Sequence, residues 1–471
     1  MLGATLGAAL GPAVLAGLDR LETLNDRGST IDDYRQDGNN WALFTHNIVH
    51  ITEGLDLTLG LRYTNDKKDF SATFGNDNVV CQQQQAALSP FLAAGGTAAA
   101  LAGGLIGLSC QGNSTAELNG VSISDERSED EFTGTAILSY KPTDDLMLYA
   151  SYSRGYKAGG FNLDRSALKA PIATFASFGG GNAQAGAQAL VGGLQFDPET
   201  VNSYEIGAKY ATVPFSLSIT GFRSEFSSFQ LNTFDGTVFI VQNINGCSTA
   251  LGGADSDQAK FGAAPNFSAT AAATGTCAAD DVTYGVRSQG VELEASLVPA
   301  PDFRVNLGLT YADTSYREDL VGSNSGAALN PSLRKLPGDN LSNAPEIVAT
   351  GSFSWTPEIG NSGLYGLVYV DGRMTGDYNT GSDLFPQKEQ DGYAIFNARV
   401  GIRGAEERWS LELWAQNIFD KDYAQVAFNS PFQEGATTAA FQDPQYPGGR
   451  QIFSQFLAEP RTYGITGRFN F

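Results

Sequence analysis

Regular alternation of apolar and polar residues is the feature that most limits how this chain folds. From Leu55 to Tyr63, leucine or tyrosine occupies every second position, and polar or small residues stand between them. The same alternation runs through 204–210, 291–297 and 303–311. Successive side chains of a β-strand point to opposite faces, so this pattern predicts strands with one apolar and one wet face. We therefore expect an all-β chain.

Candidate strands recur along most of the chain. The run from Trp409 to Gln416 keeps the alternation with one lapse, at Trp414. A strand needs about 9 to 11 residues to cross a bilayer, and most of these segments are at least that long. The thirteen candidate strands are 41–51, 55–70, 127–141, 144–161, 199–212, 214–234, 236–243 continuing at 283–298, 302–318, 341–356, 363–378, 389–403, 407–423 and 460–471.

Short and long connections alternate between these strands. The short polar turns are 52–54, 141–145, 212–214, 299–302, 357–363 and 403–408. The long connections are 71–126, 162–198, 319–340, 379–388 and 424–459. One outer turn, near Asp235, is tight instead of long. The next strand, however, is interrupted by a long insertion from Cys247 to Cys277. Short periplasmic turns and long extracellular loops are typical of an antiparallel transmembrane β-barrel, whereas a soluble sandwich does not sort its connections in this way.

The strand count and the N-terminus bear on domain organisation. Bacterial single-chain barrels have an even number of antiparallel strands, so thirteen means either that the count is wrong by one or that strands before residue 40 are absent. Residues 1–18 are apolar, but no Lys or Arg precedes Arg20, and a secretory signal begins with positive charge. We expect residues 1–36 to be a loop or a truncated barrel remnant, and residues 37–471 to be the barrel.

Charge and hydropathy exclude two classes of protein. The net charge is -22 and no basic run occurs, which excludes nucleic acid as a partner. A mean hydropathy of -0.17 argues against a helical membrane protein. The apolar stretch 86–108 is long enough to span a bilayer as a helix, but it is mainly Ala and Gly and contains Pro90. We expect it to be a tethered, partly helical loop.

The four cysteines fall into two local pairs, Cys81 with Cys110 and Cys247 with Cys277. Four cysteines allow three pairings, and nearest-neighbour disulfides in an oxidising compartment fit best, with free buried thiols as the alternative. No Cys-x-x-Cys motif occurs, and the two histidines lie four residues apart on one strand, roughly 13 Å from each other. We expect no metal site and no cofactor.

Catalytic chemistry is sparse. His46 and His50 share one strand, so a Ser-His-Asp arrangement is not expected, and Glu292 with Glu294 fits a wet lumen wall better than a pair of catalytic carboxylates. The glycine runs at 179–181 and 192–193 lack the Lys-Ser or Lys-Thr of a phosphate loop. Acidic loop residues that are weaker candidates for a divalent cation are Asp255, Asp257, Asp280 and Asp281.

The C-terminal segment is an amphipathic strand with terminal aromatics. Tyr463, Ile465, Phe469 and Phe471 share one face. This resembles the terminal strand that the barrel-assembly machinery recognises in bacterial outer-membrane proteins. Further segments, taken together and in order, resemble the barrels of TonB-dependent receptors; they are 149–162, 199–210, 289–295, 342–355 and 416–423.

The resemblance implies a 22-stranded barrel, an N-terminal plug domain and a TonB box, and it implies uptake of a scarce nutrient across the outer membrane. Nothing here resembles the plug or the box, so about nine strands and the plug would lie outside this chain, and we expect a fragment. The implied partners are outer-membrane lipid and lipopolysaccharide, the barrel-assembly machinery, a small-molecule nutrient and, through the missing plug, the TonB complex. No ligand-contact residue is carried over. Lumen or rim residues are expected at Arg62, Tyr149, Arg154 and Tyr156.

Three functional hypotheses follow. The first is the barrel of a TonB-energised importer of a nutrient such as an iron–siderophore complex. The second is a plugless passive porin or a structural fragment that does not transport. The third is an outer-membrane enzyme, which the two histidines on one strand do not favour.

Overall fold

One antiparallel sheet of thirteen strands dominates the molecule. The computed structural model describes residues 10–24, 31–110, 114–168, 173–234, 239–251, 275–330, 333, 335–404, 408–429, 434–435, 449–450 and 453–470. The strands of the sheet, in spatial order, are β1 (Asp33–Thr52), β2 (Leu55–Thr73), β3 (Ser122–Thr143), β4 (Leu146–Lys157), β7 (Glu199–Ala211), β8 (Phe215–Ser227), β12 (Val286–Ala300), β13 (Phe303–Tyr316), β15 (Ile347–Trp355), β16 (Tyr365–Thr375), β19 (Tyr393–Arg403), β20 (Trp409–Gln416) and β25 (Thr462–Phe469).

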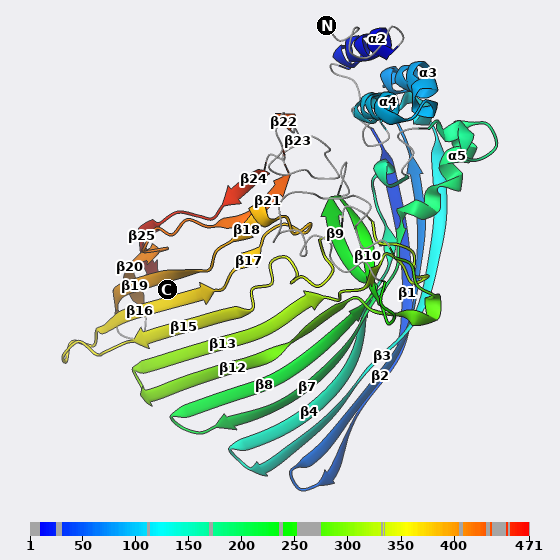
Figure 1. Ribbon diagram of the computed structural model, residues 1–471. Coiled ribbons are helices and arrows are strands. Elements are labelled where there is room, and N and C mark those ends of the chain that lie inside the picture. The colour runs from blue at the N-terminus through cyan, green and yellow to red at the C-terminus, as the bar shows by residue number, and fades with distance from the viewer. Residues whose placement is uncertain are drawn as a thin grey trace.

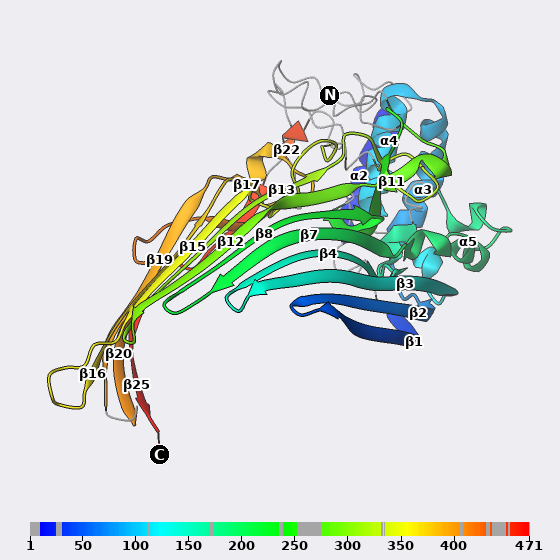
Figure 2. The ribbon, with the colours of Figure 1, turned by 90° about the horizontal axis from the view of Figure 1, so that it is seen from below.

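The sheet is a meander, because its spatial order follows the order of the chain. It curves strongly, with tight turns along one end and the long loops, helices and small sheets gathered at the other (Figures 1 and 2). This confirms the predicted all-β, antiparallel architecture with connections sorted by length. The edge strands β1 and β25 run in the same direction, because every neighbouring pair between them is antiparallel.

The register explains why the alternation produces two unlike faces. Leu57 lies opposite Leu138, whose next neighbour across the sheet is Ala150, followed by Ile206. Directly opposed residues of neighbouring strands share a face, so one apolar position on each strand extends into an apolar band across the sheet. We call the face that carries Leu57, Leu138 and Ile206 the outer face, and the opposite one the inner face.

The strand predicted at 214–234 is too long. Strand β8 ends at Ser227, and Ser228 adopts a left-handed backbone conformation with a φ of 50°. The Ser228 amide donates to Asn245 Oδ1, which holds the break in place. The chain then leaves the main sheet for a small one made of β9 (Phe229–Phe234), β10 (Phe239–Cys247), β11 (Val282–Tyr284) and β14 (Leu320–Val321).

The strand predicted to join 236–243 with 283–298 is also wrong in its first half, because β10 pairs with β9 and not with β8. Gly285 separates β11 from β12 and donates its amide to Phe226 O. The predicted 407–423 ends early as well: Asn417 and Asp420 have φ values of 47° and 56°, which an extended strand does not accommodate.

Three helices form a layer at the loop end: α2 (Leu10–Glu22), α3 (Val79–Ala93) and α4 (Gly96–Ser109) (Figure 1). Helix α3 begins at Asn78, whose side chain accepts hydrogen bonds from the amides of Val80 and Cys81, as in an N-cap. Helices α3 and α4 cover most of the stretch 86–108, which was expected to be a partly helical loop. None of the described helices is long and apolar enough to cross a membrane. The predicted domain boundary after residue 36 stays a prediction; the first strand begins at Asp33.

Smaller elements lie in the long loops. Among the described residues these elements are η2 (Ala116–Leu118), η3 (Arg165–Leu168), η4 (Phe175–Ser177), α5 (Ala183–Ala189), η5 (Val191–Leu194), η7 (Ala279–Asp281) and η9 (Pro386–Lys388). The short strands are β5 (Gly160–Phe161), β6 (Gln195–Phe196), β17 (Tyr378–Asn379), β18 (Glu389–Gln390), β21 (Ala424–Asn429), β22 (Glu434–Gly435), β23 (Gly449–Arg450) and β24 (Phe453–Leu457).

Three hydrophobic cores lie at the loop end of the sheet. The first packs Phe70 and Phe74 of the β2 end against the loop helices, through residues such as Leu194. The second surrounds Ile244 and joins the small sheet to the main one. The third holds α2, α3 and α4 together. The curved sheet forms a trough, and the long loops are folded onto one end of it. We call that end, with the loops, helices and small sheets that cover it, the mouth.

Candidate functional site

The inner face of the sheet is built from small polar side chains that hydrogen-bond across strands. Register places Ser216, Ser296, Asn306, Ser352 and Asp371 in one row over five strands. Ser296 Oγ donates to Asn306 Oδ1 at 2.9 Å, and Asn306 Nδ2 donates to Ser352 Oγ at 3.0 Å. The outer face differs: Leu307, beside Asn306, has 56% of its surface exposed although it is apolar.

A second row on the inner face carries charge. The register places in this row, strand by strand, Lys209, Ser218, Glu294, Gly308, Thr350 and Arg373. The two rows line a hollow of about 710 Å³. Because both signs of charge and many hydroxyls face it, this wall can exchange hydrogen bonds with a hydrated solute along its length.

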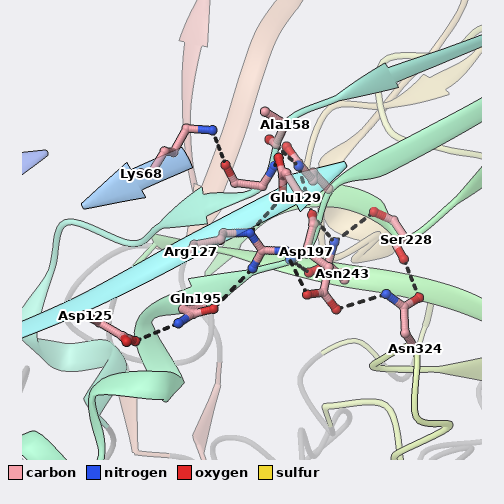
Figure 3. Close-up of polar contacts among 12 residues, drawn as sticks. Lys68, Asp125, Arg127, Glu129, Ala158, Gln195, Asp197, Ser228, Asn243 and Asn324 are labelled. Carbon is pink, nitrogen blue, oxygen red and sulfur yellow. Dashed lines mark hydrogen bonds and ion pairs between the residues drawn. The ribbon is translucent and has the colours of Figure 1, made fainter. Parts of the chain in front are cut away.

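A polar network holds the loops at the mouth of the trough (Figure 3). Its centre is Arg127 of β3, whose guanidinium donates to Glu129 at 2.9 Å, to Asp197 at 3.2 Å and to Gln195 at 3.3 Å. Lys68 of β2 joins the network by donating to Gly159 O at 2.8 Å. The network thus ties the loop ends of β2 and β3 to the connection between β4 and β7.

Asp197 extends the same network to the small sheet (Figure 3). Its amide donates to Asn243 Oδ1 at 2.7 Å, and Asn243 Nδ2 donates to Ser228 O at 2.8 Å. Asn324 Nδ2 donates to the Asp197 carboxylate at 3.0 Å, and Ser228 Oγ donates to Asn324 Oδ1 at 2.6 Å. Charge-assisted hydrogen bonds of this kind fix loop geometry, so the mouth presents a pre-formed polar surface.

An acidic pocket of about 450 Å³ lies farther along the mouth and includes Asp339, Asp377, Glu389 and Asp391 with Tyr378. Burial, followed by the charges of the three aspartates, raises the pKa of Glu389 above its usual value. Within the described residues, no group of three or more His, Cys, Asp or Glu side chains is placed to hold a metal ion.

The structure places the sequence-derived candidates on the inner wall or in loops. His50 Nδ1 contacts Asp56 Oδ1 at 2.5 Å near the β1–β2 turn, and His46 lies opposite Gly60. Glu292 lies two residues before Glu294 on the inner face of β12, as predicted for a wet wall. Asp281 accepts a hydrogen bond from Ser248 at its backbone oxygen. Asp255 and Asp257 lie outside the described residues.

The expected lumen and rim residues are engaged with neighbours. Tyr149 Oη hydrogen-bonds to Thr220 Oγ1 at 2.9 Å on the inner face, and Arg62 Nε donates to Thr64 Oγ1 at 2.9 Å. Arg154 is 3.9 Å from Glu131, and Tyr156 lies opposite Thr200 in the register of β4 and β7. None of these contacts identifies a ligand.

The cysteine pairs differ. Cys81 and Cys110 are joined by a disulfide between the first turn of α3 and the end of α4. Cys247 and Cys277 carry free thiols. The expected pairing of Cys247 with Cys277 therefore stays a prediction.

The C-terminal strand carries its aromatic face outward. Tyr463, Ile465 and Phe469 have 79%, 70% and 72% of their surfaces exposed. Ile465 lies opposite Leu413 on the outer face. Phe471 lies outside the described residues, and recognition by the assembly machinery stays a prediction.

Sequence reasoning missed the charged residues that organise the mouth, Arg127 and Asp197 above all. Arg127 does stand in an unusually charged run, DERSEDE, at the start of β3. That run was the available signal, but its partner Asp197 is 70 residues away and unmarked by any pattern.

Comparison with known proteins agrees with this architecture. A family described as "TonB dependent receptor-like, beta-barrel" matches residues 11–418. The ferric-pyoverdine M114 receptor PbuA of Pseudomonas sp. (strain M114) is 29% identical over 191 residues, which are 40% of this chain and 18% of that receptor.

Two solved structures share the fold. The ferric yersiniabactin uptake receptor FyuA from Yersinia pestis matches with a TM-score of 0.57 and 16% identity, over 94% of this chain and 47% of that one. The siderophore receptor PiuA from Acinetobacter baumannii matches with a TM-score of 0.51 and 16% identity, over 92% of this chain and 43% of that one. The chain spans less than half the length of each of these three relatives.

Proposed function

The chain belongs to the TonB-dependent receptor-like β-barrel family, and from this we propose that it forms the wall of a receptor for TonB-energised uptake of a scarce nutrient, with an iron–siderophore complex as the cargo. Proteins of this family are transport receptors of the outer membrane of Gram-negative bacteria, not enzymes. The chain accordingly lies in the outer membrane, which its strands cross.

The observation that carries the choice of cargo is the likeness to PbuA, a ferric-pyoverdine receptor, at 29% identity over 191 residues. The fold shared with FyuA and PiuA is consistent with the same class of cargo. The identity covers only part of either chain, so the proposal names a class of ligand and not pyoverdine itself.

The geometry supports a transport wall in two ways. The outer face is apolar, as a surface in contact with lipid must be, and the inner face carries the two polar rows around the hollow. The network around Arg127 and Asp197 holds the loops in a fixed arrangement where an extracellular ligand arrives. Lipid and lipopolysaccharide then contact the outer face, the assembly machinery contacts β25, and TonB acts through a plug domain inside the barrel.

Uptake of iron tests the proposal directly. The complete reading frame that encodes this chain is expressed in a Gram-negative strain that lacks its own siderophore receptors, and radiolabelled iron is supplied with a panel of siderophores that includes pyoverdine. We expect accumulation of iron with at least one siderophore, and we expect it to vanish when the TonB gene of the host is deleted.

The same experiment distinguishes the alternatives. Uptake that persists without TonB would identify a passive pore. Protein that is present in the outer membrane but supports no uptake of any ferric siderophore would contradict the choice of cargo. Conductance of the purified protein in a planar bilayer separates these outcomes, because a passive pore conducts ions continuously.

A further inference from the structure

Two thiols meet at the far end of the small sheet. Cys247 is the last residue of β10, and Cys277 lies just before η7, on the other side of segment 248–276. Each thiol is close enough to the other to change its pKa, and Cys247 Sγ lies 3.1 Å from Thr249 Oγ1. Cys247 has 1% of its surface exposed, whereas Cys277 is half-buried.

The backbone holds both cysteines against one hairpin. The Cys247 amide donates to Asp319 O at 2.9 Å, and the Cys277 amide donates to Gly326 O at 3.0 Å. Asp319 immediately precedes β14, and Gly326 lies in the turn that the bridge between Val321 and Ala328 closes. The approach of the two thiols therefore follows from main-chain hydrogen bonds and does not depend on the thiols themselves.

A second set of contacts joins the chain segments that carry the thiols. Cys247 lies opposite Val282 in the register of β10 and β11. The next residue, Ser248, donates its amide to Asp281 O at 2.9 Å and its hydroxyl to Asp281 Oδ1 at 3.2 Å. Gly326 has a φ of 73°, and a Cβ at this position would collide with Cys277 O. This close approach requires glycine at position 326.

We propose that Cys247 and Cys277 form a second disulfide in the exported protein and thereby tie segment 248–276 to the small sheet at the mouth. The arrangement has the prerequisites of a structural disulfide: neighbouring thiols, backbone held by hydrogen bonds on both sides and an extracellular position. It parallels the Cys81–Cys110 disulfide, which likewise closes an excursion at the loop end.

Thiol–disulfide exchange with an external disulfide accounts for the bond. The more exposed Cys277 sulfur attacks the donor and forms a mixed disulfide, and one donor thiol leaves. The Cys247 sulfur then attacks Cys277 and releases the second donor thiol. Two cysteine thiols are oxidised to one disulfide, and the donor disulfide is reduced to two thiols that receive both electrons and both protons.

The electrostatics favour the second step, whereas the raised pKa of Cys277 slows the first. Burial acts to raise the pKa of Cys247, but hydrogen bonds from Cys277 and Thr249 outweigh it and lower that pKa. Burial, and then the hydrogen bond to Cys247, raise the pKa of Cys277 to about 11. Cys247 is therefore the sulfur of the pair that more readily carries negative charge, as the attacking sulfur of the second step requires.

Differential alkylation tests the proposal. The full chain is purified from outer membranes without reductant, equilibrated with oxidised glutathione, denatured and treated with one alkylating reagent, then reduced and treated with a second. We expect mass spectrometry to find the second reagent on Cys247 and Cys277, as on Cys81 and Cys110. The first reagent on both Cys247 and Cys277 after this equilibration would overturn the proposal.

Variants distinguish a disulfide between Cys247 and Cys277 from two buried free thiols. In Cys277→Ser, Cys247 must take the first reagent, because it has lost its partner. In the Cys247→Ser, Cys277→Ser double variant, limited proteolysis should cut within 248–276 faster than in the unaltered protein, while Cys81→Ser, Cys110→Ser serves as the matched control and should leave that rate unchanged. Equal cutting rates in all three proteins would contradict a disulfide that restrains the chain between Cys247 and Cys277.

Discussion

At the scale of single residues, the structure buries charged side chains where loops must be held together. Arg165 has 1% of its surface exposed, pairs with Asp32, donates to Gly75 O at 3.1 Å and stacks over Phe74. These contacts join the start of β1, the end of β2 and the loop after β4. Sequence reasoning did not find this pair, because Asp32 and Arg165 are 133 residues apart and each looks like an ordinary loop residue.

Asp32→Asn should destabilise the loop region. The substitution removes the negative charge that Asp32 places beside the buried Arg165 guanidinium, and breaking a buried ion pair from one side typically costs about 3–5 kcal/mol. Hydrogen exchange at the Ile31 amide, which donates to Gly75 O, measures the free energy of local opening. Asp37→Asn is the matched control, because its pair with Arg35 is exposed and water screens the attraction between the two charges. Equal effects of the two variants would contradict a stabilising role for the buried pair of Arg165 and Asp32.

The lapse at Trp414 also has an explanation at this scale. Trp414 faces inward, its ring covers Gly464 of β25, and its Nε1 donates to Thr466 Oγ1 at 3.1 Å. A large apolar residue is tolerated on the polar face because a glycine opposite makes room for it and a threonine satisfies its nitrogen. The alternation rule alone could not anticipate this, since it depends on the residue across the strand pair.

Gly464→Val should weaken the terminal strand. A Cβ at Gly464 would lie 2.5 Å from Trp414 Cζ2, and overpacking of this kind costs about 1–3 kcal/mol. Gly467→Val is the matched control in the same strand, because nothing lies within 4 Å of its Cβ position. The urea dependence of unfolding in detergent micelles should show a lower midpoint for the first variant than for the second; the reverse order would be inconsistent with the packing described.

At the scale of elements, each of the thirteen predicted strands has a counterpart in the thirteen-stranded sheet. Periodicity succeeded there because every strand has one apolar and one polar face. It failed at the mouth, where β9 and β10 form a separate sheet and α3 with α4 form a disulfide-linked pair. Those elements are buried on other loops, so their residues follow tertiary contacts and carry no regular alternation. The candidate site was predictable as a polar wall, but the network around Arg127 was not.

An added charge should destabilise the protein on the outer face of a strand and have little effect on the inner face. Ile219 lies on the outer face of β8 and Ser218 beside it on the inner face, opposite Lys209 and Glu294. Ile219→Arg places a charge in lipid and should cost about 2–4 kcal/mol in the free energy of unfolding in bilayers, whereas Ser218→Arg should change it little. A larger loss in Ser218→Arg would mean that the faces have been assigned the wrong way round.

At the scale of the whole molecule, a barrel wall with a folded mouth explains the composition. The polar inner face and the loops account for a mean hydropathy of -0.17 in a protein that lies in a membrane, because the apolar residues are spread over one face. The edge strands β1 and β25 run in the same direction, so closure by antiparallel pairing requires an odd number of further strands between them. This matches a chain that spans less than half of FyuA or PiuA.

The most direct test is the accessibility of nitroxide labels at two adjacent positions of β13, Leu307 and Asn306. Single cysteines are introduced there in a protein whose Cys247 and Cys277 are serine, labelled, and reconstituted in lipid. The label at Leu307 should collide mainly with dissolved oxygen, and the label at Asn306 mainly with a water-soluble nickel chelate. Equal access of the chelate to both labels would show a sheet surrounded by water on both faces, and would contradict a transmembrane wall.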